Sequence, residues 1–270
     1  MFPYLSAWIL GYAIVAFLFS LVIPFPYGKF SKSMLPLQID PRIAWGLQHG
    51  SVLIGLIFGW VDLDGWYMDL PVTNKGWVAL CFLVCHFLWR GIISQVAFAK
   101  HGTKQTSILL PIVGLLYFIP VGLNFRRMCH EIVEDYEAID SIPLVLAIVC
   151  LILNIIVESL YQSWREDTAN CYAFNDETRK YYGNYVRSDF LGERFILFQY
   201  GFQTPNYTFE ILEWTFFALF VFQYEALWWA IATFLFLVSR GAWTAHWVGE
   251  VSKAWEKPKK SYKLNKYVIF

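Results

Sequence analysis

The sequence has little charge for its length, and the charge that it has is balanced. Only 16% of the 270 residues are charged, whereas 57% are hydrophobic, and Lys plus Arg equals Asp plus Glu at 21 each. A soluble domain of this size needs more charged residues to cover its surface. A net charge of zero gives no electrostatic argument for nucleic acid as a partner. The composition therefore indicates an integral membrane protein that is surrounded by membrane lipids.

Several sequence motifs are also missing. The chain has no Gly-x-Gly-x-x-Gly and no Gly-x4-Gly-Lys-Ser/Thr pattern, which excludes the usual Rossmann and P-loop settings for a nucleotide. Its five cysteines form no Cys-x-x-Cys pair and have no zinc-like spacing with histidine, so no metal site is predicted. No internal repeat or low-complexity tract divides the chain. We expect one domain over residues 1–270.

The chain contains long apolar runs. About 20 apolar residues cross a bilayer. The first run is interpreted as a retained helix rather than a signal peptide, because it lacks a basic start and ends in Pro-Phe-Pro. The last two runs are separated only around residues 223–225, which predicts a tight helical hairpin. The fold class is thus an all-α, polytopic bundle of seven transmembrane helices over 4–24, 44–61, 77–98, 107–125, 142–162, 208–223 and 226–245.

The distribution of Lys and Arg predicts the orientation of this bundle. Connections 25–43 and 99–106 and the tail 246–270 are rich in Lys and Arg, and connection 163–207 carries five of them, whereas connections 62–76 and 126–141 are acidic. Basic connections stay on the cytosolic side of a membrane. We therefore expect seven crossings with a cytosolic loop at 163–207, containing a polar stretch at 166–194 that is either a lid or a plain solvated loop, and a cytosolic C-terminal tail.

Polar residues recur at helical spacing within two of the apolar segments. In the fifth segment they stand at i, i+4, i+7 and i+11, and in the sixth at i, i+4 and i+7, so each set lies along one helix face. Two arginines in other segments could simply pair with these carboxylates and fix the packing. The alternative is a water-accessible cavity for a nucleotide, in which arginine binds phosphates and the carboxylates bind hydroxyl and amide groups. The residues are Asn154, Glu158, Tyr161 and Arg165; Asn206, Glu210 and Glu213; and Arg90 and Arg240.

Four stretches carry a family resemblance. They are 42-RIAWGLQHGS-51, 86-HFLWRG-91, 154-NIIVESLYQSWR-165 and 206-NYTFEILEW-214. In this order, over most of the chain, they resemble the steroid 5α-reductase family of membrane reductases. The related trans-2-enoyl-CoA reductases share the PNYTxE pattern at 205–210 and the HGT at 101–103.

The resemblance implies a multi-pass reductase of the endoplasmic reticulum membrane that uses NADPH. Such an enzyme reduces a carbon–carbon double bond conjugated to a carbonyl in a lipid-like substrate, here most similar to 3-oxo-5α-steroid 4-dehydrogenase, and a monomer suffices for it. The positions that match the family's cofactor residues are Arg90, Asn154, Glu158, Arg165, Asn206, Glu210, Arg240 and His246.

Two departures from the family pattern affect the expected substrate. Gln48 is followed by His49 where the steroid reductases have a glutamate, and Phe87 stands where they have a tyrosine. The resemblance implies that these two positions hold the steroid ketone. The expected hydrogen-bond donors to the substrate carbonyl are therefore Tyr207 and His49, with Gln48 as an orienting group. Phe87 has no donor and can only shape the substrate pocket.

Other functions stay open on the sequence. One is a trans-2-enoyl-CoA reductase of fatty-acid elongation. A second is a membrane methyltransferase that uses S-adenosylmethionine, which is smaller and less anionic than NADPH and needs fewer arginines. A third is a channel, transporter or scaffold without catalysis, although the polar residues gather toward one side of the membrane instead of lining a continuous path. A reductase that has lost its activity is the fourth.

Overall fold

The computed structural model describes residues 3–22, 38–58, 72–97, 106–134, 136–166 and 205–254. Within these ranges it leaves out some side chains, including all those of 160–166 and 240–254. Among the predicted site residues, the side chains of Arg165, Arg240 and His246 therefore lie outside the described part. So do residues 167–204 of the predicted loop and 255–270 of the predicted tail.

The fold is all-helical apart from one two-residue strand pair, as predicted. A π-helical turn, η2, joins α3 to α4 without a break, and a 3-10 turn, η4, leads into α6. The described residues therefore form one long helical stretch for each of the seven apolar segments. The elements are α1 Pro3–Val22, β1 Gln38–Ile39, α2 Pro41–Phe58, α3 Asn74–Leu88, η2 Trp89–Ile93, α4 Ser94–Ala97, β2 Thr106–Ser107, α5 Leu109–Glu131, η4 Ala138–Asp140, α6 Ser141–Glu166, α9 Pro205–Val221 and α10 Tyr224–Ala254.

Helix ends differ from the prediction where polar residues continue a helix. Helix α5 extends past residue 125 to Glu131, and the Arg127 guanidinium donates to the Glu131 carboxylate at 2.6 Å across one turn. Helix α10 likewise continues past residue 245 to Ala254. An apolar run marks only the part of a helix that is apolar, so it misses such extensions.

The predicted hairpin joins α9 to α10, which end and begin two residues before the predicted bounds of 223 and 226. Phe222 adopts a left-handed conformation with φ of 53°, and its amide donates to the Ala218 carbonyl at 2.9 Å. A single left-handed residue after the last helical position is a common way to end a helix. The chain then turns at Gln223 and enters α10.

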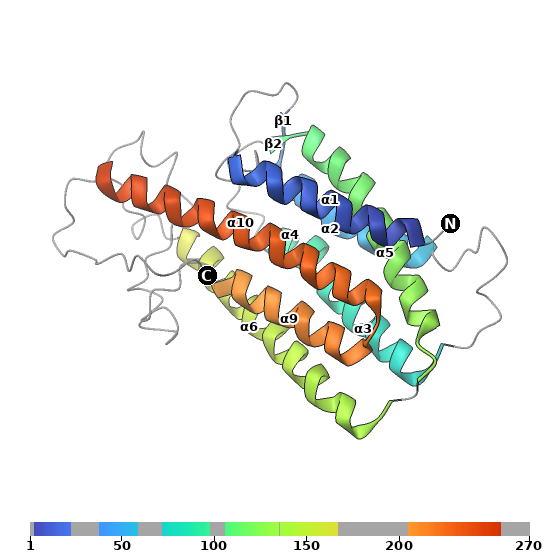
Figure 1. Cartoon of the computed structure of the whole chain (residues 1–270). Helices are drawn as coiled ribbons and strands as arrows, with labels where there is room; N and C mark the ends of the chain where they lie inside the picture. Colours follow the sequence, from blue (N-terminus) through green and yellow to red (C-terminus); the bar gives the residue numbers. More distant parts are fainter. Residues whose placement is uncertain are drawn as a thin grey trace.

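The helices pack side by side in one bundle (Figure 1). Helix α6 lies along α9, α9 along α10, α10 along α1, and α2 along α5, while α3 contacts α2, α5 and α9. Glycine allows the closest of these approaches. A Cβ on Gly122 of α5 would lie 2.2 Å from the Val52 carbonyl oxygen of α2, and one on Gly55 of α2 would lie 2.4 Å from the Ile119 oxygen of α5. Small residues of this kind are typical of close helix contacts in membranes.

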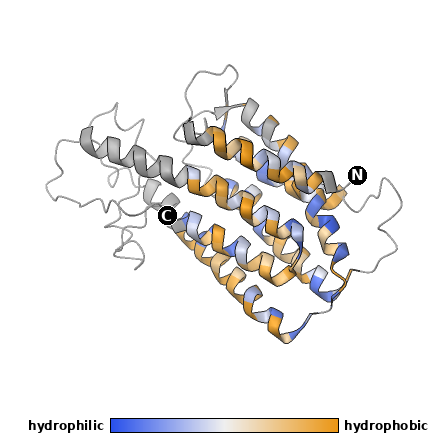
Figure 2. Cartoon of the chain, in the orientation of Figure 1, coloured by the Kyte–Doolittle hydropathy of each residue, from blue (hydrophilic) through white to orange (hydrophobic). Residues whose placement is uncertain are grey.

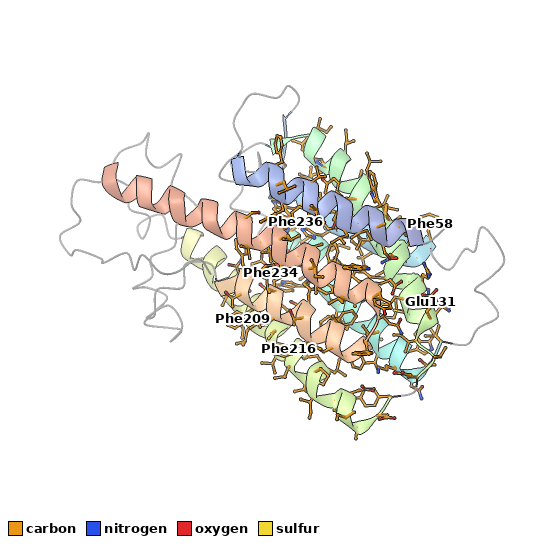
Figure 3. All side chains as sticks on the ribbon, in the orientation of Figure 1. Phe58, Glu131, Phe209, Phe216, Phe234 and Phe236 are labelled. Carbon is orange, nitrogen blue, oxygen red and sulfur yellow. The ribbon has the colours of Figure 1, made fainter. Side chains whose placement is uncertain are left out.

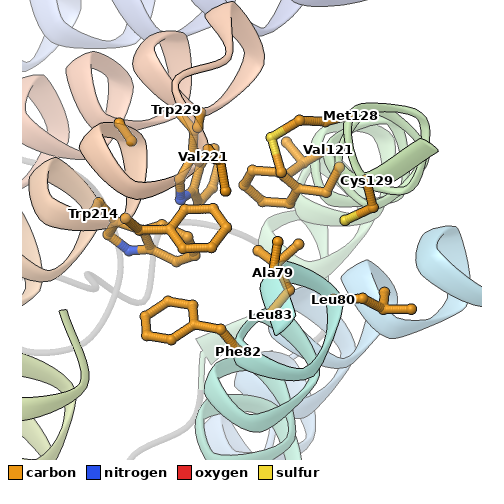
Figure 4. Close-up of a cluster of buried hydrophobic side chains, with 14 of the residues drawn as sticks. Ala79, Leu80, Phe82, Leu83, Val121, Met128, Cys129, Trp214, Val221 and Trp229 are labelled. Atoms are coloured by element: carbon orange, nitrogen blue, oxygen red, sulfur yellow. The ribbon is translucent and has the colours of Figure 1, made fainter. Parts of the chain in front are cut away.

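The core is an aromatic cluster between α3, α5, α9 and α10 (Figure 4). Trp214 stacks on Phe125 with ring centroids 5.8 Å apart and meets Trp229 edge to face at 5.6 Å. Phe82 stacks on Phe217 at 4.8 Å. Such geometries add about 0.5–1.5 kcal/mol per pair to the burial of the rings. This cluster fixes α3 against α9, which positions the site described below.

The connections meet at opposite ends of α5. At its start, β1 pairs with β2, which brings connections 25–43 and 99–106 together. At its end, the Thr73 hydroxyl donates to the Ile132 carbonyl at 3.0 Å, and Lys75 pairs with Asp140 at 3.1 Å and lies 5.8 Å from the Phe220 ring. Connections 62–76 and 126–141 and the α9–α10 hairpin thus share one end. The two ends of α5 thus gather connections that the Lys and Arg distribution assigns to opposite sides of a membrane; the orientation itself stays a prediction.

The start of α2 has a charged cap. The Asp40 carboxylate accepts hydrogen bonds from the Arg42 amide, at 2.8 Å, and from its guanidinium. The hydrogen bond from the Arg42 side chain holds the pKa of Asp40 below its ordinary value. A carboxylate at this position also satisfies the free amide groups of the first turn.

Large apolar side chains are exposed on several helices of the bundle, which are largely hydrophobic (Figure 2), and Figure 3 labels one of them, Phe58. On α6, Ile142 is 64% exposed and Val145 is 55% exposed, and Phe58 at the end of α2 is 60% exposed. Within the described residues, two stretches, Asn74–Ala97 and Ala138–Ser159, are long and apolar enough to cross a membrane, while Leu5–Phe19 and Tyr224–Ser239 are shorter apolar helices. Seven membrane crossings stay a prediction.

Candidate functional site

Arg90 joins three helices by two ion pairs. Its Nη1 donates to Glu158 Oε1 on α6 at 2.8 Å, and its Nη2 donates to Glu210 Oε2 on α9 at 2.5 Å. The three side chains are only 13%, 20% and 10% exposed. Hydrogen bonds between ions in such a setting are short and strong. The structure thus brings together three of the predicted cofactor residues.

The local backbone explains how Arg90 reaches both carboxylates. Arg90 lies in the π-helical turn η2, and π-turns inside α-helices are frequent at functional sites. Its carbonyl accepts hydrogen bonds from Ser94 Oγ at 3.0 Å and Gln95 Nε2 at 3.2 Å. A Cβ on the next residue, Gly91, would lie 2.6 Å from the Gly50 amide nitrogen of α2. Only glycine lets the turn pack this closely on α2.

A second ion pair, His86 with Glu213, lies about one helical turn away from the first and was not predicted as a site from the sequence. His86 Nδ1 and Glu213 Oε1 are 2.5 Å apart, and their side chains are 2% and 0% exposed. His86 precedes Arg90 by four residues on α3, and Glu213 follows Glu210 by three on α9. Helical spacing from the predicted residues on both helices could have indicated this pair.

Several buried polar atoms of the cluster have no hydrogen-bond partner among the described residues. They include Asn154 Oδ1, Thr208 Oγ1, Arg90 Nε and the second carboxylate oxygens of Glu158 and Glu213. More than nine in ten buried polar groups in proteins are paired with protein or ordered water. Trp89 Nε1, next to Arg90, and Trp214 Nε1, beside His86, belong to the same set, so water molecules or a ligand with both donors and acceptors would satisfy it.

The charge of the cluster limits what Arg90 can bind. Both terminal nitrogens of its guanidinium donate to carboxylates, so its geometry is that of the predicted packing pair and not of a phosphate clamp. Within the described side chains, Glu158, Glu210 and Glu213 outnumber this one arginine. The side chains of the two other predicted arginines, Arg165 and Arg240, are outside the described part.

The predicted catalytic residues on α2 pack against α5. The His49 ring stacks on Trp45, with centroids 5.1 Å apart and planes 3° apart, and contacts Phe118 at 5.1 Å. Gln48 lies beside Gly114, where a Cβ would come within 2.4 Å of its Cγ. His49 is 9% exposed, so its ring is buried among these aromatic side chains.

The two remaining predicted residues lie in different surroundings. Phe87 is 1% exposed and packs in the aromatic cluster, 5.8 Å from Trp214 and 6.4 Å from Trp229. Tyr207 is half-buried beside Asn206 in the first turn of α9. It precedes Glu210 by three residues, so it lies one turn from the ion cluster along the same helix.

Comparison with known proteins gives no further guidance, since no family model and no curated protein matches this chain. The function must therefore be argued from the site. What the described residues define is a helical bundle with an apolar exterior and an ion cluster at the junction of α3, α6 and α9.

Proposed function

We propose that the protein is a membrane reductase that uses NADPH to reduce a carbon–carbon double bond conjugated to a carbonyl in a lipid substrate, as 3-oxo-5α-steroid 4-dehydrogenases do, in the endoplasmic reticulum. The observation that carries the proposal is the buried ion cluster of Arg90, Glu158 and Glu210 inside a bundle with an apolar exterior. Charged groups in such a place are expensive and usually functional.

The apolar exterior supports the membrane part of the proposal. Isoleucine, valine and leucine side chains run along one face of α6 at 39–64% exposure from residue 142 to residue 156. Monomeric soluble proteins rarely expose contiguous apolar patches of more than a few hundred Å². In a bilayer, lipid chains would cover this face, so that no apolar side chain would be exposed to water. An apolar substrate could then enter the bundle from the bilayer.

The unpaired acceptors fit the neutral, hydrogen-bonding parts of a dinucleotide. Asn154 Oδ1 and Glu158 Oε2 could accept from carboxamide N–H or ribose O–H groups. Half-buried Asn206 lies one turn before Glu210 on the facing helix. Arg165 and Arg240 remain for the phosphates. NADPH, once bound, would supply a hydride; the protein orients the reactants and excludes water.

Tyr207, helped by His49, would polarise the substrate carbonyl. A phenol with its ordinary pKa of about 10 is protonated at neutral pH and can donate throughout. Phe87 cannot do so, because it has no donor. Its position in the aromatic cluster suits it to shaping the apolar part of the pocket, with Gln48 orienting His49 or the substrate.

A second candidate function has one observation in its favour. The excess of carboxylates in the cluster suits a cationic cofactor, and S-adenosylmethionine carries a sulfonium cation. A membrane methyltransferase would use that charge. The binding experiment below separates the two candidates.

The experiment is a titration of the purified protein in lipid nanodiscs with NADPH, NADH and S-adenosylmethionine. We expect saturable NADPH binding that Glu158→Ala and Arg165→Ala each weaken. Glu131→Ala is the matched control, because Glu131 pairs with Arg127 away from the cluster. Equal NADPH affinity in all variants, or binding of S-adenosylmethionine alone, would contradict the proposal.

Turnover tests the proposed donor. Tyr207→Phe removes one hydroxyl and keeps the ring, so it should lower the rate by about 100-fold, the usual effect of losing one donor to a developing oxyanion. NADPH affinity should not change. Tyr136→Phe is the control, since its hydroxyl contacts Ser141 at the start of α6, far along the helix from Glu158. Wild-type turnover in Tyr207→Phe would assign the donor role to His49.

A further inference from the structure

The His86–Glu213 pair differs from the other ion pairs of the described residues because both of its side chains are almost fully buried, at 2% and 0% exposure. Nδ1 and Oε1 are 2.5 Å apart. Two lone pairs facing each other at this distance would repel, so a proton must lie between the two atoms. The pair is therefore a place where the bundle holds a proton.

This pair belongs to the same electrostatic network as Arg90. It lies about 6 Å, one turn, further along α3 and α9. Charges about one helical turn apart interact strongly where little water screens them. Protonation of any member thus changes the energy of the others.

The network needs protons to approach neutrality. Among its described side chains, three carboxylates face one guanidinium, so two protons would make it neutral. An uncompensated buried charge costs several kcal/mol. The proton in the short His86–Glu213 contact is the one that a neutral imidazole carries on Nδ1, so it removes none of this excess. A second proton on His86, at Nε2, would remove one of the two negative charges. The network consists of Glu158, Glu210, Glu213, Arg90 and His86.

His86 also contacts the apolar core. Its ring meets Phe87 edge to face at 4.9 Å and Trp214 at 4.6 Å. Both rings belong to the aromatic cluster. The His86 ring therefore lies at the boundary between the charged network and the apolar interior.

We propose that His86 is the proton donor of the site and that Glu213 is its positioning residue. This rests on the proposed function, in which reduction adds a hydride to the β-carbon and a proton to the α-carbon of the substrate. The imidazolium of His86 would give that proton from Nε2: its N–H bond breaks, a C–H bond forms, and neutral imidazole then regains a proton from water. Glu213 holds Nδ1 and stabilises the imidazolium, while the hydrogen bond from Tyr207 stays on the carbonyl oxygen.

The first test needs neither cofactor nor substrate. Proton NMR of the wild-type protein in nanodiscs should show a strongly deshielded resonance from the proton between Nδ1 and Oε1. The resonance should be absent in His86→Gln and in Glu213→Gln and present in the control His130→Gln. Its absence from the wild-type protein would overturn the proton-holding pair, whether or not NADPH binds. Failure of the proposed function and failure of this inference are thereby distinguishable.

The second test is the pH profile of NADPH oxidation with a 3-oxo-Δ4-steroid or another enone lipid. His86→Gln should lower turnover by about 100-fold, the low end of the effect of general acid catalysis, and leave NADPH affinity unchanged. Glu213→Gln keeps an acceptor but loses the charge that favours the imidazolium, so its activity should fall off at lower pH than in wild type. A purely structural pair would lower stability in both variants and leave the pH profile as in wild type. That result, or wild-type turnover in His86→Gln, would overturn the proposal.

Discussion

Replacing Arg90 by methionine should destabilise the bundle severely. Methionine has a similar volume but no donor, so the substitution removes two charge-assisted hydrogen bonds, of 2.8 and 2.5 Å, and leaves Glu158 and Glu210 unpaired. Each such bond contributes about 1.5–3 kcal/mol. Removing one partner of a buried ion pair typically costs about 3–5 kcal/mol, because the remaining charge stays buried. We expect a loss of stability in that range.

The measurement is the free energy of unfolding in mixed micelles, compared with two reference variants. Arg127→Met removes one pair with Glu131, whose side chains are 19% and 31% exposed, and should cost less than Arg90→Met, because it leaves a single, more exposed carboxylate unpaired. The triple variant Arg90→Met, Glu158→Gln, Glu210→Gln removes all three charges and should recover much of the stability that Arg90→Met loses.

Two results would refute this reasoning. If Arg90→Met costs no more than Arg127→Met, the cluster is hydrated and its ion pairs are not buried in the way that the structure shows. If the triple variant is as unstable as Arg90→Met, the loss comes from packing around the side chain rather than from unpaired carboxylates.

Three further outcomes are expected from other parts of the bundle. Gly122→Ala should lower the free energy of unfolding by at least about 1–3 kcal/mol, because its Cβ would lie 2.2 Å from the Val52 carbonyl oxygen. Gly11→Ala should not destabilise the protein, because a Cβ there would have nothing within 4 Å. Thermal unfolding of both variants checks this. Phe222→Gly should raise the melting temperature slightly, because the left-handed conformation costs a residue other than glycine about 1–2 kcal/mol. Phe222→Ala should not raise it. Equal melting temperatures of the two variants would contradict this prediction. A tag after Phe270 should be cleaved by protease outside sealed microsomes, and protection would reverse the predicted orientation.

The helices could be predicted from the sequence because each is marked by its own apolar run. The seven runs recover every long helical stretch of the described residues, and the alternation of basic and acidic connections foretells which connections meet. The ends of the helices were harder to predict from the sequence. The continuation of α5 to Glu131 depends on a polar pair, Arg127 with Glu131, and the α9–α10 turn depends on the backbone of Phe222. Neither the ion pair nor the backbone turn can be recognised in the hydropathy of the sequence.

The site could be predicted only in part, for a similar reason. Helical spacing identified Glu158 and Glu210 as residues of facing stripes, and both meet Arg90. The partners themselves could not be known, since spacing along one helix does not tell which helix lies opposite. His86 was missed because a single histidine in an apolar run is usually a packing residue. Its contact with Glu213 exists only once α3 and α9 are side by side.

The position of the charges relative to the aromatic cluster bears on what the bundle can do. Helices that need only to be held together in lipid can use glycine contacts and aromatic packing, and this chain has both, at Gly55 and Gly122 and around Trp214. The ion cluster is therefore not required to join α2 to α5 or α3 to α9. With Glu213 it adds three carboxylates, two buried and one 20% exposed, to helices that are already packed, at a desolvation cost that packing alone does not explain. A ligand that uses the unpaired oxygens of Asn154 and Glu158, and a reaction that uses a proton of the His86–Glu213 pair, would both account for that cost.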